Sequence, residues 1–224
     1  LFHLQPETAY VNDINENLIL VYTVIRDNVE ELIQELKKYR NEKDFFYSVR
    51  NWDRDREKYD SLSEVERAAR ILYLNKTCYN GLYRVNSAGE FNSPFGSYRN
   101  PNIVNEPVLR AVSAYFNAAA VYFSCMDYAE VLAQVKRGTF VYLDPPYDPV
   151  SVTSSFTGYA KSGFTRDDQI RLRTCCDDLS RRGIQFIMEQ YAAYRITVVR
   201  ARRAVNSVAG RRGDVDEVVV RNYG

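Results

Sequence analysis

The chain contains an apolar run that ends in a polar, proline-rich motif: Thr139-Phe140-Val141-Tyr142-Leu143-Asp144-Pro145-Pro146-Tyr147. The first five residues are β-branched, aromatic or aliphatic, which predicts a buried strand. The strand is expected to end at Asp144, because each proline fixes its own φ angle and lacks an N–H group for a sheet. Pro146 also restricts Pro145, so the turn is stiff. Open α/β sheets bind ligands at the carboxyl ends of their strands, and the motif is therefore expected at a binding site.

This turn offers two hydrogen-bond acceptors, the Asp144 carboxylate and the Pro145 carbonyl. An exocyclic amino group of a nucleobase is a poor nucleophile, because its lone pair is delocalised into the ring. Two acceptors would orient the NH2 group and direct its lone pair at an electrophile, while Tyr147 stacks on the ring. The same four residues also fit a proline-stiffened turn with an aspartate cap and no catalytic role, since short motifs often match by chance.

Further strand and helix patterns lie on both sides of the motif. Strands are expected at residues 9–11, 121–124, 139–143, 184–188, 196–199 and 217–221, the last two as an antiparallel pair at a sheet edge. Helices are expected at residues 18–25, 27–36, 45–50, 63–77, 106–114 and 165–183. Capping signals mark three of these helices: Asp27 with Glu30, Ser63 with Glu66, and Thr165.

Two segments differ in composition from the rest of the chain. Residues 40–62 are charged and aromatic, and beyond the short helix at 45–50 they are expected to form a loop. Residues 79–98 are rich in glycine, asparagine and aromatic residues, and Ser87-Ala88-Gly89 predicts the turn of a hairpin.

Composition restricts the possible chemistry. The 224 residues are 46% apolar, which suits one compact domain or a domain with a sizeable insertion. The four cysteines lack metal-ligand spacing and two are adjacent, which favours reduced thiols and a cytoplasmic location. None follows a proline, which argues against cytosine-C5 methylation. His3 is the only histidine, which argues against a histidine base or a multi-histidine metal site. We expect no metal, no membrane span and no signal peptide.

The charge is close to balanced but unevenly distributed. The formal net charge is +1, which is not typical of a nucleic-acid-binding protein. Residues 195–212, however, contain six arginines and no acidic residue. This segment fits a phosphate-contacting patch and a solvated basic face equally well.

Several further segments, in order along the chain, carry a resemblance to a known family. They are Tyr10-Val11-Asn12-Asp13-Ile14-Asn15, Arg67-Ala68-Ala69-Arg70, Tyr79-Asn80-Gly81-Leu82-Tyr83-Arg84-Val85-Asn86, Gly89-Glu90-Phe91-Asn92-Ser93-Pro94-Phe95-Gly96, the Asp-Pro-Pro-Tyr turn and Ala201-Arg202-Arg203-Ala204-Val205-Asn206. Together they resemble the Dam-type DNA adenine-N6 methyltransferases across nearly the whole chain. The resemblance implies a Rossmann-like α/β methyltransferase sheet, S-adenosyl-L-methionine as cofactor and double-stranded DNA as partner, with the protein acting as a monomer.

The resemblance also implies roles for individual residues. Asp144, Pro145 and Tyr147 would be catalytic, and Asp144 would also border the cofactor. Asp13, at the end of a predicted strand, would bind a ribose hydroxyl; as a lone residue it also fits a helix cap. Asp127 would lie near the cofactor's adenine ring, and a helix N-cap is an equally good interpretation.

The predicted hairpin at 79–97 resembles the family's target-recognition element. Tyr79 would wedge into the duplex, and Arg84 would contact a guanine O6 and N7. Further base contacts would come from Asn80, Leu82, Asn86 and Pro94. In this family the pattern goes with the sequence GATC. Arg202 and Arg203 would contact the DNA backbone.

The target adenine must leave the stack to reach a methyl donor. Tyr147 would hold one face of the flipped base, and Phe156, Tyr159 or Phe164 the other; ordinary loop packing is the alternative for these three. The resemblance divides the chain into a catalytic, cofactor-binding domain, residues 1–26 and 115–224, and a helical and β-hairpin DNA-recognition insertion, residues 27–114.

Two segments that the family would contain do not occur in this sequence. A glycine-rich cofactor loop, Phe-x-Gly-x-Gly, is expected just before Leu1, and a crossover helix is expected between Met188 and Glu189. The alternative functions are a DNA-binding module without activity in this form, or an amino-methyltransferase acting on cytosine N4, RNA adenine or a glutamine side chain. The leading Asp144 argues against cytosine N4 and glutamine, whose families have Ser or Asn there.

Overall fold

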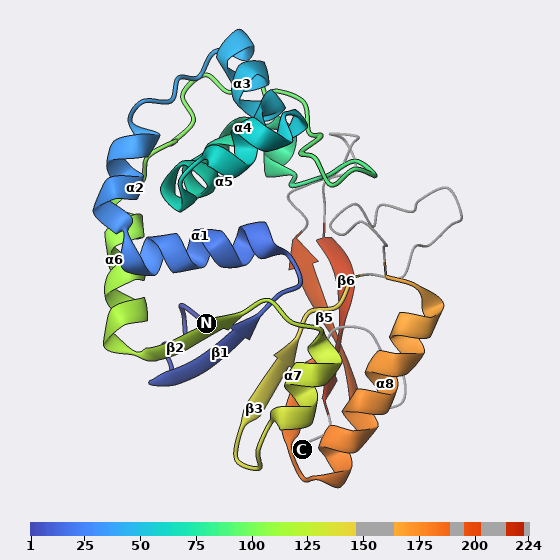
Figure 1. Cartoon of the computed structure of the whole chain (residues 1–224). Coiled ribbons are helices and arrows are strands. Elements are labelled where there is room, and N and C mark those ends of the chain that lie inside the picture. Colours follow the sequence, from blue (N-terminus) through green and yellow to red (C-terminus); the bar gives the residue numbers. More distant parts are fainter. Residues whose placement is uncertain (147–163, 189–194, 203–213, 222–224) are drawn as a thin grey trace. The chain divides into compact units, whose positions relative to one another are not determined.

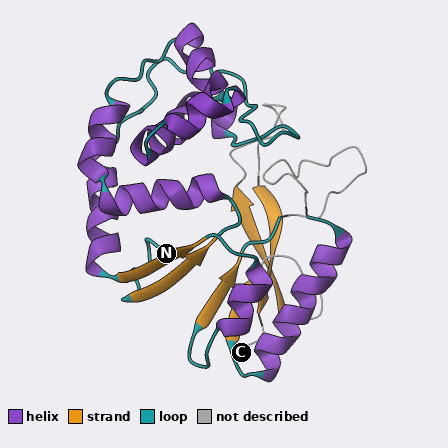
Figure 2. Cartoon of the chain, viewed as in Figure 1, coloured by secondary structure: helices purple, strands orange, loops and turns teal. Residues whose placement is uncertain are grey.

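The computed structural model describes residues 1–146, 164–188, 195–202 and 214–221. These residues form two compact units, one of residues 1–128 and the other of the described residues from 129 onward. Figure 1 labels the helices and strands, and Figure 2 shows that each unit combines both kinds of element. No helix within these described ranges is long and apolar enough to cross a membrane.

The first unit contains a two-stranded parallel sheet. Strand β1 (Thr8–Asn12) pairs with β2 (Ala120–Ser124), with Thr8 opposite Ala120 and Asn12 opposite Ser124. Parallel neighbours require a long crossover, and here the connection carries helices α1 to α6. Because both strands run in the same direction, the residues that follow them emerge at the same edge.

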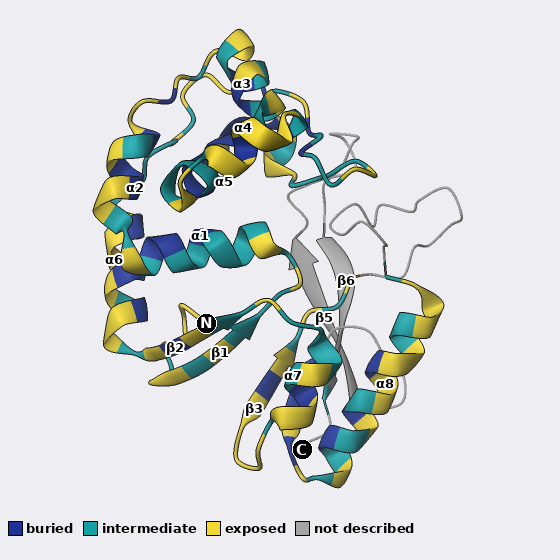
Figure 3. Ribbon diagram, viewed as in Figure 1, coloured by how far each residue is buried: buried dark blue, intermediate teal, exposed yellow. Residues whose placement is uncertain are grey.

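The helices of this connection form the larger part of the unit's core (Figure 3). Apolar residues three and four apart give α2 and α5 buried faces, such as Leu32, Ile33 and Leu36 of α2. Tyr73 of α5 is fully buried and stacks on Tyr39 with ring centroids 4.9 Å apart. The elements are α1 (Glu16–Asp27), α2 (Val29–Leu36), α3 (Lys43–Arg50), the 3-10 helix η1 (Asn51–Arg54), α4 (Arg56–Ser61), α5 (Glu64–Thr77), the 3-10 turn η2 (Tyr79–Gly81) and α6 (Glu106–Ala118).

Two predictions about these helices are wrong. Asp27 is the last residue of α1 and not the cap of α2, which begins at Val29; Glu30 instead forms an ion pair with Arg110 at 2.7 Å. Residues 51–61, expected as loop, form η1 and α4. Helix α4 buries only Tyr59, so no apolar repeat marked it in the sequence.

The second unit contains a four-stranded mixed sheet in the order β3-β4-β6-β5. Strands β3 (Phe140–Leu143) and β4 (Gln185–Met188) are parallel, whereas β6 (Asp214–Arg221) is antiparallel to β4 and to β5 (Arg195–Arg202). The predicted antiparallel pair at the sheet edge is therefore confirmed. Helix α7 begins at Tyr128 and ends at Gln134.

Helix α8 (Arg166–Arg181) follows the predicted limits closely. Thr165 and Asp168 form a capping box at its start, and Gly183 has a φ angle of +70° just after its end. Its apolar side chains Leu172, Cys176 and Leu179 are buried in the unit, and the Cys176 and Met188 sulfur atoms lie 4.0 Å apart. These contacts attach α8 to the strand that pairs with β3.

Candidate functional site

The proline-stiffened turn lies where the sequence predicted it. Asp144, Pro145 and Pro146 follow β3 directly, at the carboxyl end of the parallel β3–β4 pair. Asp144 is exposed and Pro145 is half-buried. The strand thus presents a carboxylate and a peptide carbonyl at the sheet edge. Tyr147, Phe156 and Tyr159 lie outside the described residues, whereas Phe164 is half-buried.

Two further carboxylates lie at one edge of the first unit's sheet. Asp13 comes directly after β1, and Asp127 comes three residues after β2. Both are half-buried. Asp13 Oδ1 accepts a hydrogen bond from the Asn15 N–H group at 2.8 Å, and a carboxylate can accept several such bonds. The pair can therefore receive hydrogen bonds from hydroxyl and amino groups of a cofactor such as a nucleoside.

Asn12 fixes the turn that leads to Asp127, a role that the sequence analysis missed. Its Oδ1 atom accepts hydrogen bonds from Ser124 Oγ at 2.7 Å and from the Met126 N–H group at 3.1 Å. Its Nδ2 atom donates to the Met126 carbonyl at 3.0 Å. The only local signal for this role is a polar residue at the end of a strand.

Residues 78–96 form an irregular antiparallel hairpin. Isolated bridges join Cys78 to Phe95 and Val85 to Phe91. The predicted turn is present, with Gly89 at a φ angle of +82° and its N–H group donating to the Asn86 carbonyl at 2.9 Å. Glycine tolerates this left-handed conformation without steric cost.

Some of the predicted DNA-contacting residues are exposed on the hairpin, and others form hydrogen bonds within it. Tyr79 and Leu82 are 44% and 38% exposed. Pro94 is also exposed. Asn80 adopts a left-handed backbone conformation, with φ at +56°, and is half-buried. The hairpin therefore presents an apolar surface at its base.

Arg84 and Asn86 take part in hydrogen bonds within the hairpin. Arg84 Nη2 donates to the Asn92 carbonyl across the hairpin at 3.1 Å. Asn86 Oδ1 accepts from the Ala88 and Glu90 N–H groups, each at 3.0 Å, and Asn86 Nδ2 donates to Glu90 Oε2 at 2.7 Å. The Asn86 side chain therefore shapes the turn, and the Arg84 guanidinium bridges the two arms.

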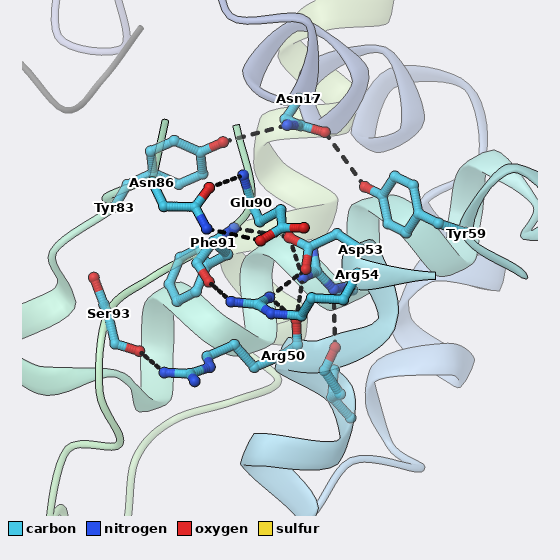
Figure 4. Close-up of polar contacts among 12 residues, drawn as sticks. Asn17, Arg50, Asp53, Arg54, Tyr59, Tyr83, Asn86, Glu90, Phe91 and Ser93 are labelled. Atoms are coloured by element: carbon cyan, nitrogen blue, oxygen red, sulfur yellow. Dashed lines mark hydrogen bonds and ion pairs between the residues drawn. The ribbon is translucent and has the colours of Figure 1, made fainter. Parts of the chain in front are cut away.

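A buried ion-pair cluster holds the hairpin at Phe91 (Figure 4). Asp53 of η1 accepts a hydrogen bond from the Phe91 N–H group, and Arg54 donates one to the Phe91 carbonyl, each at 2.7 Å. Arg70 of α5, 3% exposed, pairs with Asp53 at 2.7 Å and donates to the Val49 carbonyl at 3.0 Å. Removing one partner of such a pair typically costs about 3–5 kcal/mol, so the cluster fixes the hairpin on the helices.

The predicted basic segment is only partly described. Arg202 is the last residue of β5 and lies opposite Asp214 in the β5–β6 register. Arg203 lies outside the described residues. A phosphate-contacting role for this segment therefore stays a prediction.

Comparison with known proteins shows the family. Residues 1–208 match the family model of the D12 class N6 adenine-specific DNA methyltransferase. The type II methyltransferase M1.LlaDCHI of Lactococcus lactis subsp. cremoris is 40% identical over 235 residues, which cover 100% of this chain and 82% of the relative. The type II methyltransferase M.MjaIII of Methanocaldococcus jannaschii is 41% identical over 247 residues, covering 100% of this chain and 84% of the relative.

A third relative carries a different name. The DNA adenine methylase of Escherichia coli strain K12 is 33% identical over 220 residues, which cover 92% of this chain and 76% of the relative. The chain therefore belongs to the D12 class of N6 adenine-specific DNA methyltransferases.

Proposed function

We propose that this adenine-N6 DNA methyltransferase acts on double-stranded DNA at GATC sites, with Asp144, Pro145 and Tyr147 around the target adenine. The observation that carries the proposal is the exposed Asp144-Pro145 turn at the carboxyl end of β3. Its carboxylate and carbonyl oxygens accept hydrogen bonds from the adenine NH2 group and orient the nitrogen lone pair. Preorganised acceptors of this kind lower the barrier because they need no rearrangement during the reaction.

The methyl donor of the family is S-adenosylmethionine, whose sulfonium group supplies the methyl group when it is bound. We propose that Asp13 accepts hydrogen bonds from the ribose hydroxyls, that Asp127 borders the adenine ring and that Asp144 borders the donor. Asp13 and Asp127 are half-buried at one edge of the β1–β2 pair, which suits a polar ligand bound partly out of water. Asn12 holds the turn before Asp127 in place.

DNA recognition is assigned to the insertion of residues 27–114 and its hairpin. Tyr79 enters the duplex, Arg84 reads a guanine, and Asn80, Leu82, Asn86 and Pro94 complete the contacts. The exposure of Tyr79 and Leu82 supports this assignment. Arg202 and Arg203 would meet the phosphates. Support for GATC comes from the hairpin pattern and from a relative named DNA adenine methylase. We expect a monomer that acts inside the cell.

Substitution of Asp144 by alanine tests the chemistry. We expect methyl transfer to fall by at least about 100-fold, because one preorganised acceptor is lost, while much of the DNA binding survives. Transfer would be measured with radiolabelled donor and binding by fluorescence anisotropy. Asp167→Ala, at a carboxylate in the first turn of α8, is the matched control. Near-normal turnover of Asp144→Ala would refute the role given to this residue.

Protection of cellular DNA tests the sequence preference. DNA from cells that express the enzyme should resist a nuclease that adenine methylation blocks at GATC, and DNA from cells that express Asp144→Ala should be cut. Complete cutting in both would reject GATC methylation. Mass spectrometry of nucleosides would then distinguish adenine N6 from cytosine N4 or RNA, and thermal protection by S-adenosylmethionine would separate an enzyme from a DNA-binding module.

A further inference from the structure

The first turn of α1 is tied to Asp13 through two hydrogen bonds. The Asn15 N–H group donates to Asp13 Oδ1 at 2.8 Å. Asn15 is the N-cap of α1, and its Oδ1 atom accepts from the Asn17 N–H group at 3.1 Å. The position of Asn17 therefore depends on the turn that carries the Asp13 carboxylate.

The Asn17 side chain reaches the hairpin (Figure 4). Its Nδ2 atom donates to the Tyr83 hydroxyl at 3.2 Å, and the Tyr59 hydroxyl donates to its Oδ1 atom at 3.5 Å. Burial raises the pKa of Tyr59, so its hydroxyl keeps its proton at neutral pH. Both polar ends of the Asn17 amide are thus engaged, and the amide is held in one orientation.

Tyr83 is itself fixed within the hairpin. Its ring meets Phe91 edge to face, with centroids 5.7 Å apart and an interplanar angle of 75°. Asp53 and Arg54 bind the backbone of Phe91, as described above. The next residue after Tyr83 is Arg84, the proposed guanine reader. A movement of the Tyr83 hydroxyl relative to α1 would therefore also move the reading residue.

We propose that the Asn17–Tyr83 hydrogen bond couples binding of the methyl donor at Asp13 to binding of DNA at the hairpin. The inference rests on the proposed function, which assigns these two sites. A ligand bound to Asp13 restrains the turn that carries Asp13 and, through it, the first turn of α1. DNA bound to the hairpin restrains Tyr83. Binding of either ligand therefore reduces the conformational entropy that is lost when the other binds. By thermodynamic linkage, each ligand raises the affinity for the other by the same factor.

The test compares affinities with and without DNA in the full chain. S-adenosylhomocysteine, which has no methyl group to transfer, is titrated by calorimetry in the absence and presence of a GATC duplex. We expect the wild type to bind it at least about 5-fold more tightly with the duplex, a typical coupling. Tyr83→Phe keeps the ring and its contact with Phe91. We expect this variant to bring the ratio of the S-adenosylhomocysteine affinities with and without the duplex close to 1. Its affinity without DNA should stay within about twofold of the wild-type value.

Two further variants complete the design. Asn17→Ala should give the same loss of coupling, because it removes the Asn17–Tyr83 hydrogen bond together with the contact to Tyr59. The double variant should lose no more coupling than either single variant, since both changes remove the same Asn17–Tyr83 hydrogen bond. Tyr115→Phe is the matched control, because it removes a hydroxyl that donates to the Pro6 carbonyl at 3.0 Å elsewhere in the same unit. The ratio of affinities with and without the duplex should be the same for Tyr115→Phe as for the wild type. Thermal unfolding would show that all variants fold.

The outcomes separate this inference from the proposed function. A wild type that methylates GATC but shows no coupling, or a Tyr83→Phe variant that retains the full ratio, overturns the inference and leaves the function standing. A wild type that neither methylates GATC nor binds the duplex refutes both.

Discussion

At the scale of single residues, the Arg84 side chain is restrained within the hairpin in the absence of DNA. Its Nη2 atom donates to the Asn92 carbonyl across the hairpin at 3.1 Å. The guanidinium has five N–H donors, so further donors are available to meet the O6 and N7 atoms of a guanine. A side chain restrained in this way loses less conformational freedom when it binds a base.

Arg84→Ala should therefore reduce discrimination between DNA sequences more than it slows methylation of the preferred site. We expect discrimination between GATC and single-base variants at the guanine to fall by about 1–3 kcal/mol, the usual value of a bidentate arginine–guanine contact. The measurement is kcat/KM over a panel of duplexes. Arg99→Ala, at an exposed arginine in the segment that follows the hairpin, should leave the panel unchanged. Equal discrimination by Arg84→Ala and the wild type would count against the assignment.

At the scale of elements, the hairpin depends on its neighbours more than on its own strands. Its described pairing consists of isolated bridges at Cys78–Phe95 and Val85–Phe91 and not of a continuous ladder. The Asp53–Arg54–Arg70 cluster holds its middle, and the approach of Gly96 to Cys78 closes its base. A Cβ atom on Gly96 would lie 2.7 Å from the Cys78 carbonyl oxygen and 2.6 Å from Tyr98 Cε2.

Gly96→Ala should consequently open the base of the hairpin. The Tyr98 ring can move, but the Cys78 backbone cannot without displacing the end of α5. We expect a loss of stability of about 1–3 kcal/mol, as for overpacked sites, together with a raised KM for DNA. Urea unfolding and steady-state kinetics would measure the two effects. Ser97→Ala, at the exposed neighbouring position, is the control; equal stability and KM in both variants would show that the close approach does not matter.

At the scale of the whole molecule, the net charge of +1 provides little long-range attraction for DNA. We therefore expect the proposed phosphate contacts to be local, and residues 195–212 carry six arginines without an acidic residue. The strand register places Arg202 opposite Asp214, at the end of the β5–β6 pair. The two interpretations of this segment, phosphate patch and solvated face, predict different salt dependence.

Arg202→Ala should weaken DNA binding about equally on GATC and unrelated duplexes. If Arg202 contacts one phosphate, the slope of log affinity against log salt should decrease in magnitude by about 1. Binding titrations at several salt concentrations would measure this slope. Arg173→Ala, at an arginine of α8 whose side chain is 58% exposed, is the control. Equal slopes for the Arg202→Ala variant and the wild type would favour the solvated face.

Much of the secondary structure was predictable, because its signals are local. The capping box at Ser63, the helix cap at Thr165, the turn at Ser87-Ala88-Gly89 and the antiparallel pair of β5 and β6 are confirmed. Each depends on residues close in sequence or on short runs of β-branched residues. Helix α4 escaped prediction because its single buried residue, Tyr59, forms no periodic pattern.

The sequence by itself determined the chemistry and the family, since Asp144-Pro145-Pro146 and the ordered segments around it are read from consecutive residues. Only the tertiary structure decided what holds the turn before Asp127 and the hairpin in place. The bonds from Asn12 to Met126, Asn17 to Tyr83 and Asp53 to Phe91 join positions 114, 66 and 38 residues apart. No local pattern records such partners, because a polar side chain's neighbours are set by how the helices and strands pack.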